Sequence, residues 1–491
     1  MLTIHNNFDN IFLANEYEME YWIQFVHKFI ILGGKCMKKL LTLLLSGCIL
    51  ISSLVACSGG ESATGSTSAA ASAKAESVSS EKANVNSDGT VNNPETVAVD
   101  KDKLIFWSLF SGGDGAYMDK IVKEYNATNP KKQVQSVMLV WADYYTKLAT
   151  AVAAGKGPDI GVSHISKLPE LVDEGIVVPI DNYTKNSGTD WTQYTDSMNA
   201  GVSFNGSHYA MPLDTHAQIL YINKDLIQKA NIKLNSSGQL DIKTVDDFRG
   251  MLGKLKSIMP DGSSALGLPQ KGEDPYRVWW ATYFQMGGTP LVNDAGDKVT
   301  LDKAKAVKAA EFVKSLYKDG YIKAGIEDHQ KYFQGGQAGM LLAGTWATGA
   351  FEQTKDLHFS AQPFPQLFEK DACWADAHTL IIPTKKSRSE EDTQAAVDFI
   401  NYVSNKGALT WAGSGQIPSN LSVQTSKGYK NMPYRSSYVE AAKTAVLPSQ
   451  NSHFYAMKDG MIKNLDTFWT DQATAENAIN NLYSELESNL G

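Results

Sequence analysis

Cysteine is scarce in this sequence, and its scarcity limits both how the chain is stabilised and which metal sites it can form. Four cysteines occur among 491 residues, and three of them lie at or before Cys57, so that only Cys373 remains in the body of the chain. A disulfide framework and a cysteine-based metal site are therefore excluded within that body. We expect no metal, no cofactor and a fold that depends on the size of its hydrophobic core.

Basic residues are too few and too dispersed for a nucleic-acid partner. Lys and Arg number 45 against 53 Asp and Glu, which gives a net charge of -8 at pH 7, whereas phosphate backbones require a concentrated cationic surface. The sequence also lacks the Gly-x-Ser-x-Gly elbow, the phosphate loop ending in Gly-Lys-Ser/Thr and the His-Glu-x-x-His zinc pair. Three common catalytic signatures are thus missing, and we expect a protein that is not an enzyme.

Long hydrophobic runs are absent except for one near the start, from Leu40 to Val55. Met37-Lys38-Lys39 precedes it, and a basic start before an apolar middle is typical of a secretory signal, with translation from Met37. The alternative is that residues 1–36 form a cytoplasmic segment before a signal anchor. The run ends in Leu54-Val55-Ala56-Cys57, which resembles the lipobox of bacterial lipoproteins, although a signal can also end in cysteine by chance.

The lipobox implies cleavage before Cys57 and a diacylglycerol on its thiol. We therefore expect residues 1–56 to be an upstream extension and lipoprotein signal peptide, and residues 57–100 to be the lipidated cysteine and a flexible tether. Residues 58–99 contain no aromatic side chain, and a segment that cannot bury apolar surface stays disordered. As a coil it would span roughly 35 Å. Acyl chains would hold the protein on the extracellular face of the cell membrane.

From Leu104 onward, short apolar runs alternate with segments of helical periodicity. The expected strands are 104–107, 135–140 and 159–163, and the expected helices carry Met118 to Tyr125, Tyr144 to Val152 and Leu168 to Val172. Alternation predicts parallel strands covered by helices, with ligands beyond the carboxyl ends of the strands. Asp114, Trp141 and His164 lie at such ends and are candidate ligand residues. The alternatives are a helix cap for Asp114, a core position for Trp141 and a satisfied loop histidine for His164.

A second set of such units begins after Lys224, and the segment Leu213-Asp214-Thr215-His216 separates the two sets. It interrupts an apolar strand pattern with a carboxylate, a hydroxyl and an imidazole. Because ligand pockets favour domain interfaces, we interpret this segment as part of a site in a cleft between two lobes. The alternative is a polar turn followed by a strand from Ala217 to Ile222.

Aromatic residues gather at two later points. The segment 274–286 carries five of them at helical spacing, which predicts that Tyr276 or Trp279 faces the cleft, with core packing for all five as the alternative. A strand that ends in glycine precedes Trp346 and exposes its indole, whose flat face can stack on a sugar ring.

Two further segments are expected to cross between the lobes. Trp374-Ala375-Asp376-Ala377-His378 precedes the apolar run 379–382, which we interpret as a strand that returns to the first lobe. The turn-rich segment 413–418 is a third passage, after which helices complete the second lobe.

These segments together resemble the extracellular solute-binding proteins of bacterial ABC importers, in the family that includes maltose- and oligosaccharide-binding proteins. The resemblance covers roughly residues 103–491, and it rests on the order and spacing of Gly157-Pro158-Asp159-Ile160, Tyr209-Ala210-Met211-Pro212, Tyr221-Ile222-Asn223-Lys224-Asp225-Leu226, Gly336 to Trp346 and Gly415-Gln416-Ile417-Pro418. It implies an α/β, two-lobe periplasmic-binding-protein-like fold with three hinge crossings and a ligand cleft between the lobes. The implied boundaries are 101–213 plus 379–412 for the first lobe and 216–373 plus 418–491 for the second.

The resemblance also implies a ligand and partners. The ligand residues of the family fall on Asp114, His164, Asp214, Tyr276, Trp346 and Asp376, and less closely on Tyr455; Trp141, Arg277 and His378 complete the expected ligand-binding site. A monomer would bind a carbohydrate, such as an oligosaccharide, by hinge closure and deliver it to the transmembrane subunits of an ABC permease.

Other ligands and functions stay open at this stage. Glycerol-phosphate carriers share the implied fold, and Arg277 is the candidate for a phosphate contact. A secreted carbohydrate-active hydrolase would need two carboxylates about 5 to 9.5 Å apart across a glycosidic bond, and the number of aspartates expected in the cleft is sufficient for such a pair. A subunit that presents its ligand to a membrane sensor is the third possibility.

Overall fold

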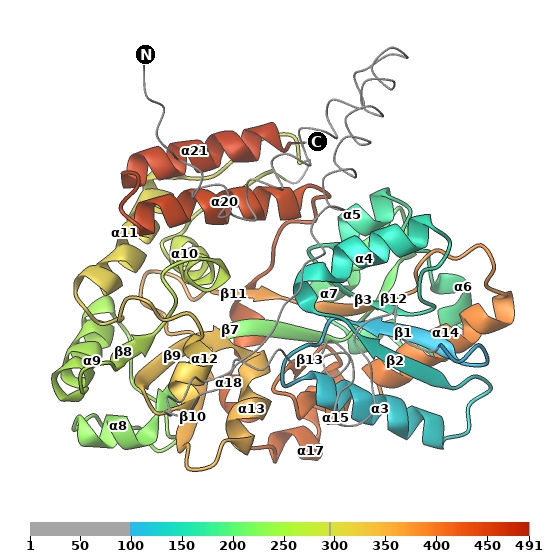
Figure 1. Ribbon diagram of the computed structural model, residues 1–491, viewed down its shortest axis with the longest axis horizontal. Coiled ribbons are helices and arrows are strands. Elements are labelled where there is room, and N and C mark those ends of the chain that lie inside the picture. The colour runs from blue at the N-terminus through green and yellow to red at the C-terminus, as the bar shows by residue number, and fades with distance from the viewer. Residues whose placement is uncertain (1–98, 294–295, 491) are drawn as a thin grey trace, which may run out of the picture. The chain divides into compact units, whose positions relative to one another are not determined.

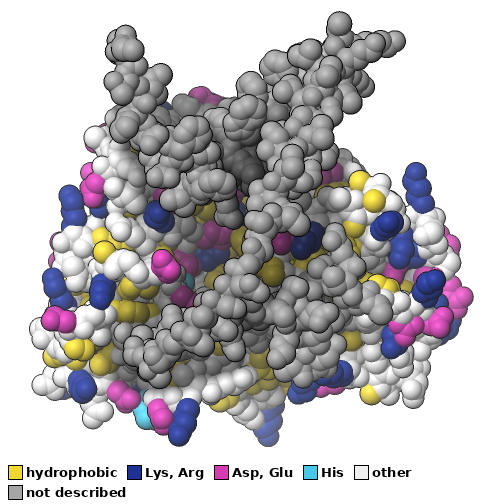
Figure 2. All heavy atoms as spheres, in the orientation of Figure 1, with side chains coloured by type: hydrophobic (Ala, Val, Ile, Leu, Met, Phe, Trp, Pro, Cys, Tyr) yellow, Lys and Arg dark blue, Asp and Glu magenta, His cyan; other side chains and the backbone are white. Residues whose placement is uncertain are grey.

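The computed structural model describes residues 99–293 and 296–490. The predicted signal peptide, Cys57 and almost all of the tether lie outside these residues. Within the described part of the chain, no helix combines the length and the apolar character that a membrane span requires. On the face shown in Figure 2, basic side chains lie interspersed among acidic ones, as the sequence predicts.

The first lobe is built on strands covered by helices. Its elements are β1 (Leu104–Ser108), α3 (Gly115–Ala127), β2 (Val134–Met138), α4 (Trp141–Ala153), β3 (Gly161–His164), α5 (Leu168–Asp173), α6 (Asp181–Thr184), η2 (Trp191–Gln193), α7 (Asp196–Gly201), β4 (Ser203–Phe204), β5 (Ser207–His208) and β6 (Ala210–Pro212), then β12 (His378–Ile381), α14 (Glu390–Ser404) and α15 (Ala408–Ala412). Strand β1 pairs in parallel with β2, and a parallel bridge joins Phe106 to Ile160 just before β3. The predicted parallel arrangement of the first three strands is therefore confirmed.

The second lobe contains a seven-stranded sheet and the remaining helices. Its elements are β7 (Asp214–Asn223), α8 (Lys224–Lys229), α9 (Val245–Ile258), β8 (Ser264–Gly267), α10 (Glu273–Gln285), α11 (Lys303–Lys318), α12 (His329–Gln334), β9 (Ala338–Gly344), η3 (Thr345–Ala347), α13 (Thr348–Gln353), β10 (Phe359–Pro363), β11 (Cys373–Asp376), β13 (Ile417–Pro418), α16 (Leu421–Thr425), α17 (Lys427–Lys430), α18 (Arg435–Tyr438), α19 (Ala441–Thr444), β14 (Ala445–Val446), α20 (Phe454–Trp469) and α21 (Ala475–Ser488). The sheet order is β14-β11-β7-β9-β8, and β10 and β13 also pair with β7.

Two separate hydrophobic cores correspond to these two sets of elements. One contains Phe106, Leu148 and Phe399, and the other contains Leu220, Trp279 and Leu482. Most elements of the first core lie on the right of Figure 1 and most of those of the second on the left, with β7 between them. The two-lobe α/β fold is confirmed, whereas the residue-level lobe boundaries given above stay a prediction.

The chain passes between the two sheets at neighbouring points. Leu213 connects β6 to β7, and Ala377 connects β11 to β12. The backbone N–H of Leu213 donates to the carbonyl of His378 (2.9 Å), and that of Ser419, which follows β13, donates to the carbonyl of Leu213 (3.0 Å). The three crossings therefore lie side by side and are joined by backbone hydrogen bonds.

The prediction that 213–216 interrupts a strand is wrong for its last three residues. Strand β7 begins at Asp214 and is buried along its whole length. Its polar start is paired on both sides, because His216 lies opposite Asp376 of β11 and Thr215 lies opposite Ile417 of β13. The other two crossings thus supply the backbone partners that keep polar residues in a buried strand.

Candidate functional site

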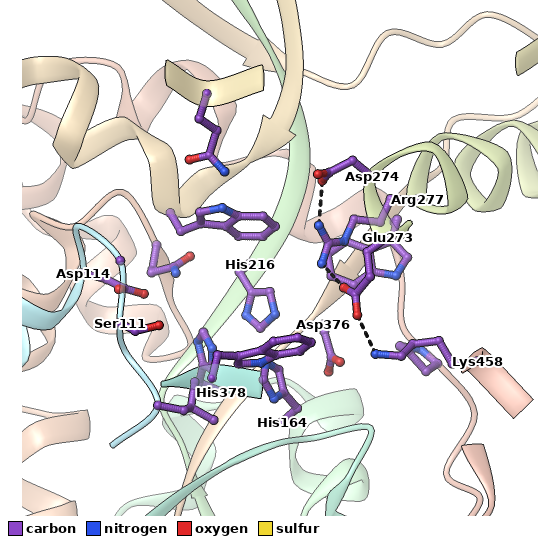
Figure 3. Close-up of a pocket in the computed structure, with 18 of the residues that line it drawn as sticks. Ser111, Asp114, His164, His216, Glu273, Asp274, Arg277, Asp376, His378 and Lys458 are labelled. Atoms are coloured by element: carbon purple, nitrogen blue, oxygen red, sulfur yellow. Dashed lines mark hydrogen bonds and ion pairs between the residues drawn. The ribbon is translucent and has the colours of Figure 1, made fainter. Parts of the chain in front are cut away.

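A pocket of about 400 Å³ lies where the two lobes meet. This volume falls within the range of small-molecule sites, about 300 to 1,000 Å³. The first lobe contributes the loop before α3, the start of α4, the end of β3 and the start of β12, and the second contributes β7, α10, η3, β11 and α20. Figure 3 shows Ser111 and Asp114 on one side and Glu273, Arg277 and Lys458 on the other, with three histidines between them.

Eight of the ten sequence-predicted residues line this pocket: Asp114, Trp141, His164, Arg277, Trp346, Asp376, His378 and Tyr455. They come from segments as far apart as the loop before α3 and helix α20. Asp214 and Tyr276 are not among the lining residues. Most of the predicted side chains therefore line one pocket, and the two exceptions have different physical causes.

The alternatives of a capping side chain for Asp114 and a core position for Trp141 do not hold. Asp114 occupies the N-cap position of α3 without making a side-chain capping hydrogen bond. Burial raises the pKa of its carboxyl above the usual value, against the opposing charge of His378. Trp141 opens α4 and is 39% exposed, so it is not a core residue. Both side chains are therefore available to a ligand in the pocket.

Asp214 is placed beneath the pocket rather than on its surface. Its side chain is fully buried, and its carboxylate accepts from Trp411 Nε1 (2.8 Å), from the backbone N–H of His378 (3.1 Å) and from the Nδ1 atoms of His378 (2.9 Å) and His216 (3.2 Å). Burial alone would raise its pKa, but the charge of His378 and these hydrogen bonds lower the pKa well below the usual range. The predicted ligand contact of Asp214 is corrected to a supporting role, because partners from distant segments use its oxygens.

Tyr276 is buried in the core of the second lobe. Its ring stacks on that of Trp279, with centroids 6.0 Å apart, and Trp279 donates to the carbonyl of Ala306 (3.0 Å). The prediction that Tyr276 or Trp279 faces the cleft is therefore wrong, and the core alternative holds for both. The next residue, Arg277, is the one that α10 directs into the pocket.

Arg277 belongs to a network of alternating charges along one wall. It donates to Asp274 Oδ1 (2.7 Å) and, through its other terminal nitrogen, to Glu273. Glu273 also accepts from Lys458 Nζ (2.8 Å), as the dashed lines in Figure 3 show. Burial would raise the pKa of Glu273, but Arg277 and Lys458 lower it to about 2. Both basic groups of the wall are therefore already paired with carboxylates.

Replacing Glu273 with glutamine is expected to reduce stability at neutral pH and to have less effect in acid. A carboxyl whose folded pKa is depressed stabilises the fold above its unfolded pKa, here 4.5, and loses that contribution as pH falls through about 2. The free energy of unfolding of the wild type should exceed that of Glu273→Gln by on the order of 2 to 3 kcal/mol at neutral pH, and the difference should shrink below about pH 4.5. Urea unfolding over this pH range measures it.

The exposed Glu311 of α11 provides the matched control. Glu311→Gln should change the free energy of unfolding little at any pH, since exposed charges contribute little. A Glu273→Gln difference that stays constant down to about pH 3 would contradict the assigned charge network.

Aromatic rings form the apolar part of the pocket wall. The guanidinium of Arg277 lies beside two of them, 5.0 Å from the ring centroid of Trp346 and 4.5 Å from that of Trp374. Trp346 follows Gly344, where an added Cβ would lie 1.8 Å from the indole. The glycine that ends β9 therefore lets the indole lie across the strand end, which is the arrangement inferred from the sequence.

Three histidines form the floor of the pocket. His164, His216 and His378 come from β3, β7 and β12, and their ring centroids lie 4.1 to 5.4 Å apart. Burial lowers the pKa of His164 and His216, and the charge of His378 adds to both effects. For His378 itself, burial also acts to lower the pKa, but the charge of Asp214 and its hydrogen bond prevail and raise it.

Sequence reasoning missed several lining residues, among them Glu273, Trp374 and Lys458, and it placed His216 in a site segment without naming it as a ligand residue. His216 and Trp374 lie inside crossing segments that were recognised, so their position was a usable signal. Glu273 adjoins Asp274-Pro275 in the first turn of α10, which is typical of a helix start and indicates no site. Lys458 is one of two lysines in helix α20, and no local pattern distinguishes it from the other.

The fold and the cleft together define a two-lobe binding protein. The family of bacterial extracellular solute-binding proteins has a model that matches residues 120–435, and the chain belongs to this family. The resemblance inferred from the sequence is thereby confirmed. The family is one of binding proteins, in keeping with the missing catalytic signatures.

Individual relatives are distant but cover most of the chain. The arabinooligosaccharide-binding protein of Bacillus subtilis (strain 168) is 24% identical over 351 residues, which is 67% of this chain and 76% of the relative. The GacH receptor of Streptomyces glaucescens, solved unliganded and with acarbose, superimposes with a TM-score of 0.70 at 18% identity over 79% of this chain and 98% of its own. UgpB from Mycobacterium tuberculosis, in complex with glycerophosphocholine, superimposes with a TM-score of 0.69 at 20% identity over 80% of this chain and 99% of its own.

Proposed function

We propose that this protein is the carbohydrate-binding component of an ABC importer and that the pocket between its lobes holds a neutral sugar. The observation that carries the proposal is the combination of aromatic faces with hydrogen-bonding carboxylates around one cavity. Trp141, Trp346 and Tyr455 offer flat apolar faces, and Asp114 offers carboxylate oxygens to hydroxyl groups. Asp376 already accepts from Ser166 and Ala377, but a carboxylate has about four acceptor sites, so it can take a further hydroxyl. Sugar rings present apolar C–H faces and vicinal hydroxyls, which these two kinds of side chain match.

The charge of the pocket favours a neutral ligand over a phosphate. Four carboxylates line it (Asp114, Glu273, Asp274, Asp376), against two basic side chains (Arg277, Lys458). Both basic side chains are already bound to Glu273, and Arg277 also to Asp274. A phosphate would have to displace a carboxylate from Arg277 and lie among the four carboxylates that line the pocket. A glycerol-phosphate ligand is therefore disfavoured.

We further propose that the protein works as a lipid-anchored monomer at the extracellular face of the membrane. Acylated Cys57 and the tether would keep the lobes close to the permease. The ligand touches both lobes in the proposed mode, so binding stabilises the closed form of the hinge, and the closed form is what the permease subunits would recognise. A subunit that presents its ligand to a membrane sensor would use the same closure.

A thermal-shift screen over mono- and oligosaccharides tests the ligand class. At least one neutral sugar is expected to raise the melting temperature, and glycerophosphocholine is expected to leave it unchanged. Stabilisation by the phosphodiester with no response to any sugar would reverse the assignment.

One observation keeps a hydrolase as the second candidate, namely the raised pKa of Asp114, since a glycosidic general acid needs such a carboxyl. Incubation of the purified protein with a labelled oligosaccharide separates the two functions. Unaltered sugar recovered from the complex supports binding, and shortened products support hydrolysis.

A further inference from the structure

The three histidines on the pocket floor have an arrangement that sugar binding does not require. His164, His216 and His378 are all buried, and one nitrogen atom of each ring lies within 4.8 Å of those of the other two. Three convergent imidazoles are the donor set of open zinc sites, in which the fourth position is left to water or substrate. We propose that these histidines bind a single divalent transition-metal ion, of the zinc type, at the base of the cleft.

Hydrogen bonds to Nδ1 prepare two of the rings for an ion. The Asp214 carboxylate accepts from the Nδ1 atoms of His216 (3.2 Å) and His378 (2.9 Å). With Trp411 Nε1 and the backbone N–H of His378 also donating to it, Asp214 accepts four hydrogen bonds and acts as an ionised carboxylate. Each ring then carries a proton on Nδ1, and a metal would take the Nε2 position, which in charged His378 means displacing its second proton. A carboxylate behind a ligating imidazole is the usual outer partner in such sites.

The third ring has an outer partner of its own. The Nδ1 atom of His164 lies 2.7 Å from the hydroxyl of Tyr145, which also accepts from the backbone N–H of His164 (2.8 Å). A hydroxyl has two lone pairs and can accept from both groups, which again leaves Nε2 for the ion. Among the described residues, no hydrogen bond engages the Nε2 atom of any of the three rings.

The three imidazole rings need to move only slightly closer together to bind one ion. Zinc–nitrogen distances of about 2.0 to 2.1 Å place the nitrogens of a tetrahedral site about 3.3 Å apart. The nitrogens are within 4.8 Å here, so side-chain shifts of roughly 1 Å are sufficient. The pocket opens above the rings, and the fourth position of the ion can therefore be taken by water or by a ligand atom. Imidazole donors suit zinc, copper and nickel, and they disfavour magnesium and calcium.

Titration of the full chain with Zn²⁺ alone, without a polyhistidine tag and at about pH 7.5, tests the proposal. One ion per chain is expected, and His164→Gln should weaken its affinity by about 100-fold or more, since a ligand is lost. His164 is the preferred target because its removal leaves the Asp214 hydrogen bonds intact. Co²⁺ as a spectroscopic probe should give intense visible absorption in the wild type and lose it in the variant.

His358→Gln is the matched control, because His358 is exposed and pairs with Asp225 at the surface (3.0 Å). This variant should bind Zn²⁺ as the wild type does. Tyr145→Phe keeps all three ligands and removes an outer partner, so it should weaken binding by about tenfold, and it remains informative if His164→Gln does not fold. Absence of saturable binding in the wild type, or equal affinity in the wild type and His164→Gln, would overturn the proposal. The metal titration contains no sugar, so its result is independent of the carbohydrate assignment.

Discussion

Replacing Asp214 with alanine is expected to lower the free energy of unfolding by about 3 to 5 kcal/mol, the cost of breaking a buried ion pair from one side. The substitution removes the acceptor of two histidine Nδ1 atoms, one backbone N–H and the Trp411 indole N–H at the point where the chain crosses between the lobes. These donors would stay buried without an equivalent partner. Urea unfolding at neutral pH measures the loss.

Asp225→Ala is the control, because that carboxylate forms an exposed pair with His358. This substitution should lower the free energy of unfolding by less than about 1 kcal/mol. Asp214→Asn should lie between the two, since one carbonyl oxygen remains as an acceptor while the new amide group opposes the existing donors. If Asp214→Ala were no more harmful than Asp225→Ala, the proposed support of the pocket floor would be incorrect.

Replacing Trp346 with alanine is expected to weaken the binding of any sugar found in the screen by tenfold or more, which corresponds to about 1.4 kcal/mol. The indole lies at the end of β9 on the pocket wall, and its loss removes an aromatic face and leaves the Arg277 guanidinium without one of its two neighbouring rings. Trp346→Phe should retain part of the affinity, since a smaller aromatic face remains. Isothermal titration of each variant gives the ratio of dissociation constants.

Trp191 provides the comparison for this measurement. It stacks on His208 in the first lobe, with centroids 3.8 Å apart, and does not line the pocket. Trp191→Ala should therefore leave the affinity unchanged. An unchanged affinity for Trp346→Ala would remove this indole from the binding site.

Most of the local structure could be predicted from the sequence because it depends on neighbouring residues. Helices α3 and α4 follow from apolar residues at helical spacing, and strands β1 to β3 follow from short apolar runs between turns. Trp346 could be assigned to the pocket because Gly344, two residues earlier, determines where the indole lies. In these cases the deciding contacts lie within a few positions of the residue concerned.

The misassigned residues depend on contacts between distant segments. Asp214 has the composition of a ligand residue, but His378 and Trp411, more than 150 positions away, use its oxygens. The helix α10 is apolar around most of its circumference, so periodicity does not reveal that Arg277, and not Tyr276, faces the pocket. The expectation of no metal considered only cysteines and one local zinc motif, and it stays a prediction that the Zn²⁺ titration tests.

The backbone hydrogen bonds of Leu213 constrain how the two halves can move. Its N–H is bound to His378 and its carbonyl to Ser419, so each crossing segment is fastened to the next at the same level of the molecule. We expect segments joined in this way to bend together about one common axis. A ligand too thick for the cleft would stop closure part-way. We therefore expect the distance between the lobes in the closed form to select ligands by size, even where their hydroxyl groups are alike.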